Sequence, residues 1–316
     1  MKLAIASGKG GTGKTTVALG LALSLAEDGS PGDGQVHPPL LMDCDVEAPD
    51  AHLFLQPIIK KRAPAAIQVP RIDPDLCSQC GDCAEVCRFN ALALLGDDVV
   101  LFPELCHGCG SCTLICPEKA ITEVPRTIGR MESGAAKGVQ FAHGVLNVGE
   151  AMAVPVIRAL KAWAEPQPGQ FIILDAPPGT SCPVVETVMG ADFVVLVTEP
   201  TPFGLHDLEL AVEMLKELGL PAGVVVNRDG TGYHELDQFC ALESLPILLR
   251  IPFDRGIAEG IARGKTLIEI RPEYRGLFRR MAQDIGEALS TLGSAWSLSP
   301  SLPINDLEDL RAIRQP

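Results

Sequence analysis

The sequence predicts an α/β protein with a mostly parallel sheet and a small inserted α+β domain. Short apolar segments of strand length alternate with longer segments of helical periodicity, as happens when helices connect parallel strands. Between residues 69 and 124 this alternation stops, and regularly spaced cysteines replace most apolar residues. The chain has 316 residues, 47% of them hydrophobic, so the larger part can bury a complete core.

The elements expected in the larger part follow from this alternation. Strands are expected at Lys2–Ala6, Leu40–Met42, Phe171–Leu174, Phe193–Val197 and Val224–Val226. Helices are expected at Thr15–Asp28, Val154–Trp163, His206–Leu218 and Tyr274–Leu292. Residues 30–39 are rich in Gly and Pro, which predicts a surface loop. The predicted organisation is an α/β domain formed by residues 1–68 and 125–294, an insert at 69–124 and an acidic tail at 295–316.

The charge of the chain excludes some partners. Its net charge is −14, whereas proteins that bind nucleic acid or an anionic membrane surface carry clustered lysine and arginine. No segment approaches the roughly 18 consecutive apolar residues of a membrane span. Residues 1–7 are too short for a signal peptide, so we expect a cytoplasmic protein. The 11 cysteines are then expected to be reduced, metal-binding thiolates and packing residues, without disulfides.

A glycine-rich segment follows the first strand and opens the first helix. Backbone N–H groups in such a segment cradle phosphates, a lysine neutralises them, and a Thr hydroxyl can ligate Mg²⁺. The sequence therefore predicts an ATP site with Mg²⁺ on Thr15. The residues of this phosphate loop and the start of its helix are Gly8, Lys9, Gly10, Gly11, Thr12, Gly13, Lys14, Thr15 and Thr16.

The second lysine of this loop, Lys9, resembles the deviant phosphate loop of the MinD/ParA/Mrp ATPases and of the nitrogenase iron protein. Further segments match that family. Asp43-Cys44-Asp45 is similar to switch I, and Ile172–Asp175 followed by Ala176–Thr180 to its Walker B and switch II segments. Val225–Arg228 and Ile251–Asp254 resemble its adenine-binding segments. The resemblance implies a MinD-like P-loop NTPase fold of the SIMIBI class.

The resemblance also implies roles for the matching residues. Lys9 would reach across a nucleotide-sandwich dimer to the partner's phosphates, and Asp45 would orient the attacking water. Lys9, Lys14 and Asp45 are thus the implied catalytic residues. Asp43 and Asp175 would hold Mg²⁺ and its waters. The remaining implied nucleotide-binding residues are Gly179 in switch II, Asn227 as reader of the base, Arg228, Pro252 and Asp254.

Two cysteine arrays in the insert carry a second chemistry. Each reads C-x₂-C-x₂-C-x₃-C, the spacing of bacterial ferredoxins with two [4Fe–4S] clusters, in which the fourth cysteine of each array ligates the other cluster. Zinc is the competing metal for such thiolates. The insert offers few apolar residues, so bound metal is expected to stabilise its fold. The predicted ligands are Cys77, Cys80, Cys83 and Cys116 for one cluster, and Cys106, Cys109, Cys112 and Cys87 for the other.

The three other cysteines are expected to be packing residues. Cys44 lies between the switch I aspartates, and Cys240 lies in a helix-like stretch. Cys182 follows switch II, where the nitrogenase iron protein has a cluster ligand. That protein needs a second cysteine upstream, and this sequence has none between Cys116 and Cys182. A cluster bridging two subunits is therefore not expected.

The combination resembles MinD-type ATPases of the orange-protein complex and iron–sulfur proteins that share the name cobyrinic acid a,c-diamide synthase. It implies an ATPase that couples ATP-dependent dimerisation and hydrolysis to electron transfer, or to assembly of a metal or iron–sulfur cofactor, on a partner protein. The dimer would be a homodimer or a heterodimer with a paralogous ATPase. Two alternatives stay open: a positioning or scaffold ATPase with structural clusters, and an iron–sulfur carrier. No Cys-x-x-Cys motif of the Mrp carriers follows Cys182.

Overall fold

The computed structural model describes residues 1–26, 37–230 and 232–292. Within these residues, nine strands form one sheet in the order β11-β10-β9-β1-β8-β2-β7-β6-β3. All neighbours pair in parallel except β6, which is antiparallel to both β7 and β3. The strands are β1 (Lys2–Ala6), β2 (Leu40–Asp43), β3 (Ile58–Ile72), β6 (Ile121–Ala136), β7 (Val139–Leu146), β8 (Ile172–Asp175), β9 (Phe193–Thr198), β10 (Ala222–Asp229) and β11 (Ile247–Pro252).

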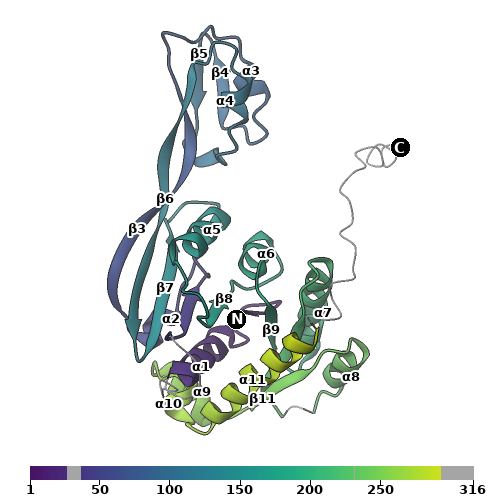
Figure 1. Cartoon of the computed structure of the whole chain (residues 1–316). Coiled ribbons are helices and arrows are strands. Elements are labelled where there is room, and N and C mark those ends of the chain that lie inside the picture. The colour runs from purple at the N-terminus through teal and green to yellow at the C-terminus, as the bar shows by residue number, and fades with distance from the viewer. Residues whose placement is uncertain (27–36, 231, 293–316) are drawn as a thin grey trace, which may run out of the picture.

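Helices cover both faces of this sheet (Figure 1). Side chains alternate between the faces along each strand. In β1, Leu3 and Ile5 therefore join one apolar core, whereas Ala4 and Ala6 join the other. The first core contains residues of α1 (Lys14–Ala26), α2 (Ala51–Leu55), α9 (Arg255–Ala262), α10 (Leu267–Ile270) and α11 (Tyr274–Leu292). The second contains residues of α5 (Ala153–Trp163), α6 (Cys182–Val188), α7 (Pro202–Glu217) and α8 (Glu235–Leu242).

Strands β3 and β6 form a long antiparallel hairpin arm. They pair from Ile58 opposite Ala135 to Ile72 opposite Ile121, well beyond the length of the other strands. Figure 1 shows this arm rising from one edge of the sheet and carrying the cysteine-rich insert at its far end. The insert contains α3 (Asp82–Glu85), β4 (Leu92–Leu95), β5 (Asp98–Leu101), the 3₁₀ turn η1 (Pro103–Leu105) and α4 (Ser111–Ile115). The predicted boundaries at 69 and 124 fall inside the two strands of the arm.

The mostly parallel α/β fold is confirmed, with shifts at element ends. Helix α7 begins earlier than predicted, because Thr201 caps it by accepting a hydrogen bond from the Gly204 N–H at 3.0 Å. The strands of the arm were not predicted. Pro64 and Pro70 interrupt the sequence of β3, and such residues are tolerated because β3 is the edge strand. The expected end of the first helix at 27–28, most of the loop at 30–39 and the tail at 295–316 lie outside the described residues.

The insert has a small apolar core. Its cluster of buried side chains consists of Cys83, Leu92 and Ile121, and two of these flank the cysteine arrays. Such a core is too small to stabilise a domain unless a bound metal or a partner adds to it. Among the helices of the described residues, none is both long and apolar enough to cross a membrane.

Candidate functional site

The phosphate loop joins the end of β1 to the start of α1, so the helix N-terminus faces the loop. Asn227 stabilises this loop from β10. Its Nδ2 donates to the carbonyl of Thr12 at 2.7 Å, and a Cβ on Gly13 would lie 2.4 Å from the same nitrogen. Gly13 also has a φ of +97°, so glycine is required there for two reasons. The family resemblance implies that Asn227 reads the base, and in this structure its side chain binds the loop.

A pocket of about 450 Å³ opens beside the loop. Its lining includes polar groups of the loop and Asp45, and apolar side chains of β11, α9 and α10. A pocket that combines phosphate-binding groups with apolar side chains has the chemistry of an adenine nucleotide site. The predicted site residues that line it are Gly10, Gly11, Gly13, Lys14, Thr15, Thr16, Asp45, Asn227, Arg228, Pro252 and Asp254.

Two of the lining residues have further roles. Lys14 is nearly buried, and burial lowers the pKa of its ammonium group, although Asp175 and Asp45 oppose this shift. A negatively charged phosphate beside such a buried ammonium group would stabilise its charged form. Asp254 caps α9 by accepting the N–H of Gly256 at 2.6 Å, and its other oxygen binds Arg271 Nη2 at 2.6 Å. Its position in the pocket wall is therefore also structural.

Asp43 and Asp175 form a buried acidic pair beneath the pocket. They end neighbouring parallel strands in register, and both are at most 1% exposed. The Asp43 carboxylate accepts hydrogen bonds from the backbone N–H groups of Asp45, Asp50 and Ala51, each at 3.1 Å. Burial and the charge of Asp175 raise the pKa of Asp43 well above its usual value.

The Asp175 carboxylate lacks well-formed hydrogen bonds among the residues that the structure describes, and the Thr15 hydroxyl is its nearby donor. Burial raises the pKa of Asp175 to about 7, with Asp50 and Asp45 adding to the shift and Thr15 and Lys14 opposing it. A buried carboxylate that lacks donors is costly unless a cation or proton satisfies it. Asp175 therefore fits the predicted Mg²⁺ role, with Thr15 as the neighbouring ligand.

Lys9 forms an ion pair with Glu199, a residue that was not among the predicted site residues. Its Nζ lies 3.8 Å from Glu199 Oε2, and the other oxygen of Glu199 accepts from Arg228 Nη1 at 2.6 Å. Glu199 directly follows β9, so the end of a parallel strand was the available signal. In this single chain, Glu199 holds the lysine that the family resemblance assigns to a partner's phosphates. Gly179 donates its N–H to the Ser7 carbonyl at 3.0 Å, which joins switch II to the phosphate loop.

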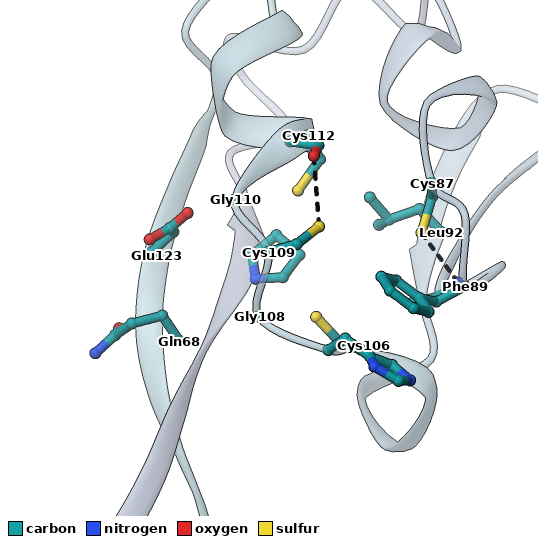
Figure 2. Close-up of a pocket in the computed structure, with 14 residues that line it drawn as sticks. Gln68, Cys87, Phe89, Leu92, Cys106, Gly108, Cys109, Gly110, Cys112 and Glu123 are labelled. Atoms are coloured by element: carbon teal, nitrogen blue, oxygen red, sulfur yellow. Dashed lines mark hydrogen bonds between the residues drawn. The ribbon is translucent and has the colours of Figure 1, made fainter. Parts of the chain in front are cut away.

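Cysteines of both arrays line each of two pockets in the insert. One pocket is lined by three cysteines of the second array and the last of the first array, namely Cys106, Cys109, Cys112 and Cys87. Figure 2 shows the sulfur of Cys87 facing the other three across this pocket. A second pocket is lined by Cys77, Cys80, Cys83 and Cys116. Each pocket thus gathers the four thiols that the ferredoxin spacing predicts for one cluster.

The backbone around the two arrays repeats. Gly81 and Gly110 each directly precede a short helix, and their own φ angles are +85° and +74°. The N–H of Ala91 lies 3.3 Å from Cys87 Sγ, and the N–H of Ala120 lies 3.3 Å from Cys116 Sγ. The helices α3 and α4 each contain the third cysteine of an array.

Within the described part of the chain, neither cysteine pocket contains a site for a single metal ion. Among the described residues, no three His, Cys, Asp or Glu side chains are close enough to bind one ion. A [4Fe–4S] cluster binds each cysteine through a different iron atom, so its four sulfurs surround a volume. The N–H groups directed at Cys87 and Cys116 are the kind of hydrogen bond that such sulfurs accept.

The remaining cysteines lie outside these pockets. Cys44 and Cys240 are buried in the apolar core, which agrees with packing roles. Burial raises the pKa of the Cys240 thiol to about 11. Cys182 is exposed at the first position of α6, so the expectation that it packs in the interior is wrong.

Comparison with known proteins shows what the chain resembles. Residues 3–268 match the family of CobQ/CobB/MinD/ParA nucleotide-binding domains (CbiA). The uncharacterized protein MJ0578 of Methanocaldococcus jannaschii is 33% identical over 73% of this chain and 79% of its own length. The protein MJ0579 of the same organism is 28% identical over 85% of this chain and 92% of its own length. An iron-sulfur cluster carrier protein of Aquifex aeolicus is 28% identical over 33% of this chain and 32% of its own length.

Solved structures share the fold. The cell division ATPase MinD of Pyrococcus furiosus superposes with a TM-score of 0.53 at 20% identity, over 91% of this chain and 99% of that one. The septum site-determining protein MinD of Pyrococcus horikoshii, in complex with Mg-ADP, gives 0.52 at 20% identity, over 90% and 94% of the two chains. These similarities show a MinD-like fold.

Proposed function

The chain belongs to the CobQ/CobB/MinD/ParA nucleotide-binding family, and from this premise we propose that it is an ATPase carrying two [4Fe–4S] clusters. In this proposal, ATP-dependent dimerisation and hydrolysis control electron transfer, or assembly of a metal or iron–sulfur cofactor, on a partner protein. The observation that carries the proposal is the pair of four-cysteine pockets on an arm that is continuous with the sheet of the ATPase domain.

The nucleotide half of the proposal rests on the phosphate loop and its surroundings. Lys14 would neutralise the phosphates, and Thr15 with the buried Asp175 would hold Mg²⁺. Asp45 lines the pocket, and burial raises the pKa of its carboxyl group, so it is placed to orient a water beside the phosphates. Phosphoryl transfer needs positioned charge and an oriented water, and these residues supply both.

The cluster half of the proposal rests on the two sets of thiols. When bound, [4Fe–4S] clusters supply one-electron redox chemistry. The chain's own contribution is to hold four thiolates around each cluster and to direct the N–H groups of Ala91 and Ala120 at two of the sulfurs. Such hydrogen bonds favour the more negative, reduced cluster.

The surface of the insert supports a protein partner. Residues 73–120 contain eight acidic and two basic residues, so a partner face with positive charge would be attracted to it. Large apolar side chains are also exposed there, which is typical of an interaction surface. They are Leu76, Phe89, Leu94, Leu95, Phe102, Leu105, Leu114 and Ile115.

The test is anaerobic iron and sulfide analysis, with EPR of the reduced protein recorded with and without MgATP. We expect two cluster signals that change when MgATP binds. In Lys14→Ala the signals should persist and the change should be lost, because that lysine lines the nucleotide pocket and neither cysteine pocket. Cluster EPR signals that stay the same when MgATP binds would instead support a scaffold ATPase with structural clusters. Zinc in place of iron would overturn the redox proposal.

A cluster carrier is the second candidate, and the similarity to the Aquifex aeolicus carrier protein favours it. That similarity covers a third of this chain. Transfer of iron from the loaded protein to an apo-ferredoxin distinguishes the two functions. ATP-stimulated transfer would support the carrier. Retention of iron together with reversible reduction would support electron transfer.

A further inference from the structure

One row of charged and polar side chains crosses the sheet from the nucleotide pocket to the hairpin arm. Asp175, Asp43, His143, Glu132 and Arg62 are successive register partners on β8, β2, β7, β6 and β3. Side chains opposite each other in register lie on the same face of a sheet. This row therefore has one end beneath the predicted Mg²⁺ site and the other on the edge strand of the arm.

Contacts join the row on the side of the arm. His143 Nε2 lies 3.1 Å from Glu132 Oε2, so the ring N–H donates to the carboxylate. The other oxygen of Glu132 accepts from Arg62 Nε at 2.9 Å and lies 3.4 Å from Arg130 Nε. His143 is 4% exposed, so its bond to Glu132 is a buried link between β7 and β6, whereas the Arg62 side chain that extends the row to β3 is exposed.

Contacts also join the row to switch I. The Asp43 carboxylate binds the N–H of Ala51, the first residue of α2. The next residue of that helix, His52, places its ring 5.1 Å from the ring of His143. The Nδ1 atoms of both rings lack hydrogen-bond partners among the described residues, so ring packing alone holds this contact. A shift of α2 would therefore reach His143 directly.

We propose that His143 and Glu132 are positioning residues that couple the switch I segment around Asp43 to the β3–β6 arm. This inference rests on the proposed function, because it assumes that MgATP binds above Asp43 and Asp175. When the nucleotide moves the segment from Asp43 to His52, the His143–Glu132 hydrogen bond transmits the change to the arm. The insert then responds to the nucleotide although it lies at the far end of the arm (Figure 1).

The test uses the full-length, cluster-loaded protein and hydrogen–deuterium exchange of residues 58–72 and 121–136, with and without MgATP. His143→Phe keeps a ring beside His52 and removes the hydrogen bond, whereas His143→Gln keeps an N–H donor. The control Glu150→Gln removes a carboxylate bound to Arg126 of the arm, outside the row. Glu132→Gln preserves size and removes the charge that Arg62 and Arg130 bind, so it serves if His143→Phe does not fold.

We expect MgATP to change exchange in the arm of the wild-type protein, the control and His143→Gln. His143→Phe and Glu132→Gln should lose at least half of that change while nucleotide affinity stays within about threefold. Two results would overturn the inference alone: nucleotide binding without a response of the wild-type arm, or an undiminished response in His143→Phe and Glu132→Gln. A wild-type chain that does not bind MgATP would overturn the proposed function as well.

Discussion

Asp43 and Asp175 lie opposite each other at the ends of adjacent parallel strands, and their two carboxylates are buried in one place. Asp43 accepts three backbone hydrogen bonds, and their donors come from switch I and the start of α2. Two buried carboxylates this close cannot both ionise without a cation. A proton on one carboxyl or a bound Mg²⁺ would relieve this repulsion.

This pair predicts a pH dependence of stability in the metal-free protein. The folded pKa of Asp175 is about 7, above the ordinary value of 3.8. Between these values the folded state binds a proton that the unfolded state releases, so stability falls as pH rises through this range. From about pH 6 to about pH 8 the loss should be about 1 kcal/mol, or a few degrees in Tm.

Asp175→Asn should remove the contribution of Asp175 to that loss, because the amide stays neutral at both values of pH. Thermal unfolding at the two pH values, without Mg²⁺ or nucleotide, measures the effect. Asp284→Asn changes an exposed carboxylate and is the control. An unaltered pH dependence in Asp175→Asn would show that another group causes it.

The ion pair between Lys9 and Glu199 predicts a restraint on dimer formation. If Lys9 must leave Glu199 to reach a partner's phosphates, Glu199→Gln should favour the MgATP-bound dimer. A partly exposed ion pair contributes up to about 1 kcal/mol, so the dimer constant should rise about two- to fivefold. Sedimentation with MgATP measures it. Glu209→Gln, which alters an exposed pair with His206 on α7, should leave the constant unchanged. An equal change in both variants would contradict the restraint.

The sequence predicted the elements whose signals are local. Buried parallel strands such as β1 and β9 are continuous apolar runs, and the phosphate loop and cysteine arrays have fixed spacings. The arm was missed because its exposed strands contain prolines and alternate irregularly. Glu199 and the row from Asp175 to Arg62 were missed for another reason. Their roles depend on which strands become neighbours and in which register, and one sequence does not contain that information.

Helix α1 packs so closely on α11 that a side chain at Gly20 would force a shift. A Cβ at this position would lie 2.5 Å from Cε2 of Phe278, whose side chain is fully buried. Gly20→Ala should therefore destabilise the protein by about 1–3 kcal/mol. Gly286→Ala is the matched control within α11, since its nearest neighbour is Met1 Cε at 4.0 Å. That change should stabilise by up to about 1 kcal/mol. Denaturant unfolding that gave both variants the same sign would contradict this packing argument.

Each predicted cluster takes ligands from both cysteine arrays, so two double cysteine variants should retain different amounts of iron. Cys87 lies with Cys109 in one pocket, whereas Cys80 lies in the other. Replacing Cys87 and Cys109 by Ala should thus damage one cluster and leave about half of the iron. Replacing Cys87 and Cys80 removes one ligand from each cluster, so little iron should remain. Iron and sulfide analysis with EPR measures both. If each array instead bound its own cluster, the two results would be exchanged, because Cys80 and Cys87 belong to the same array.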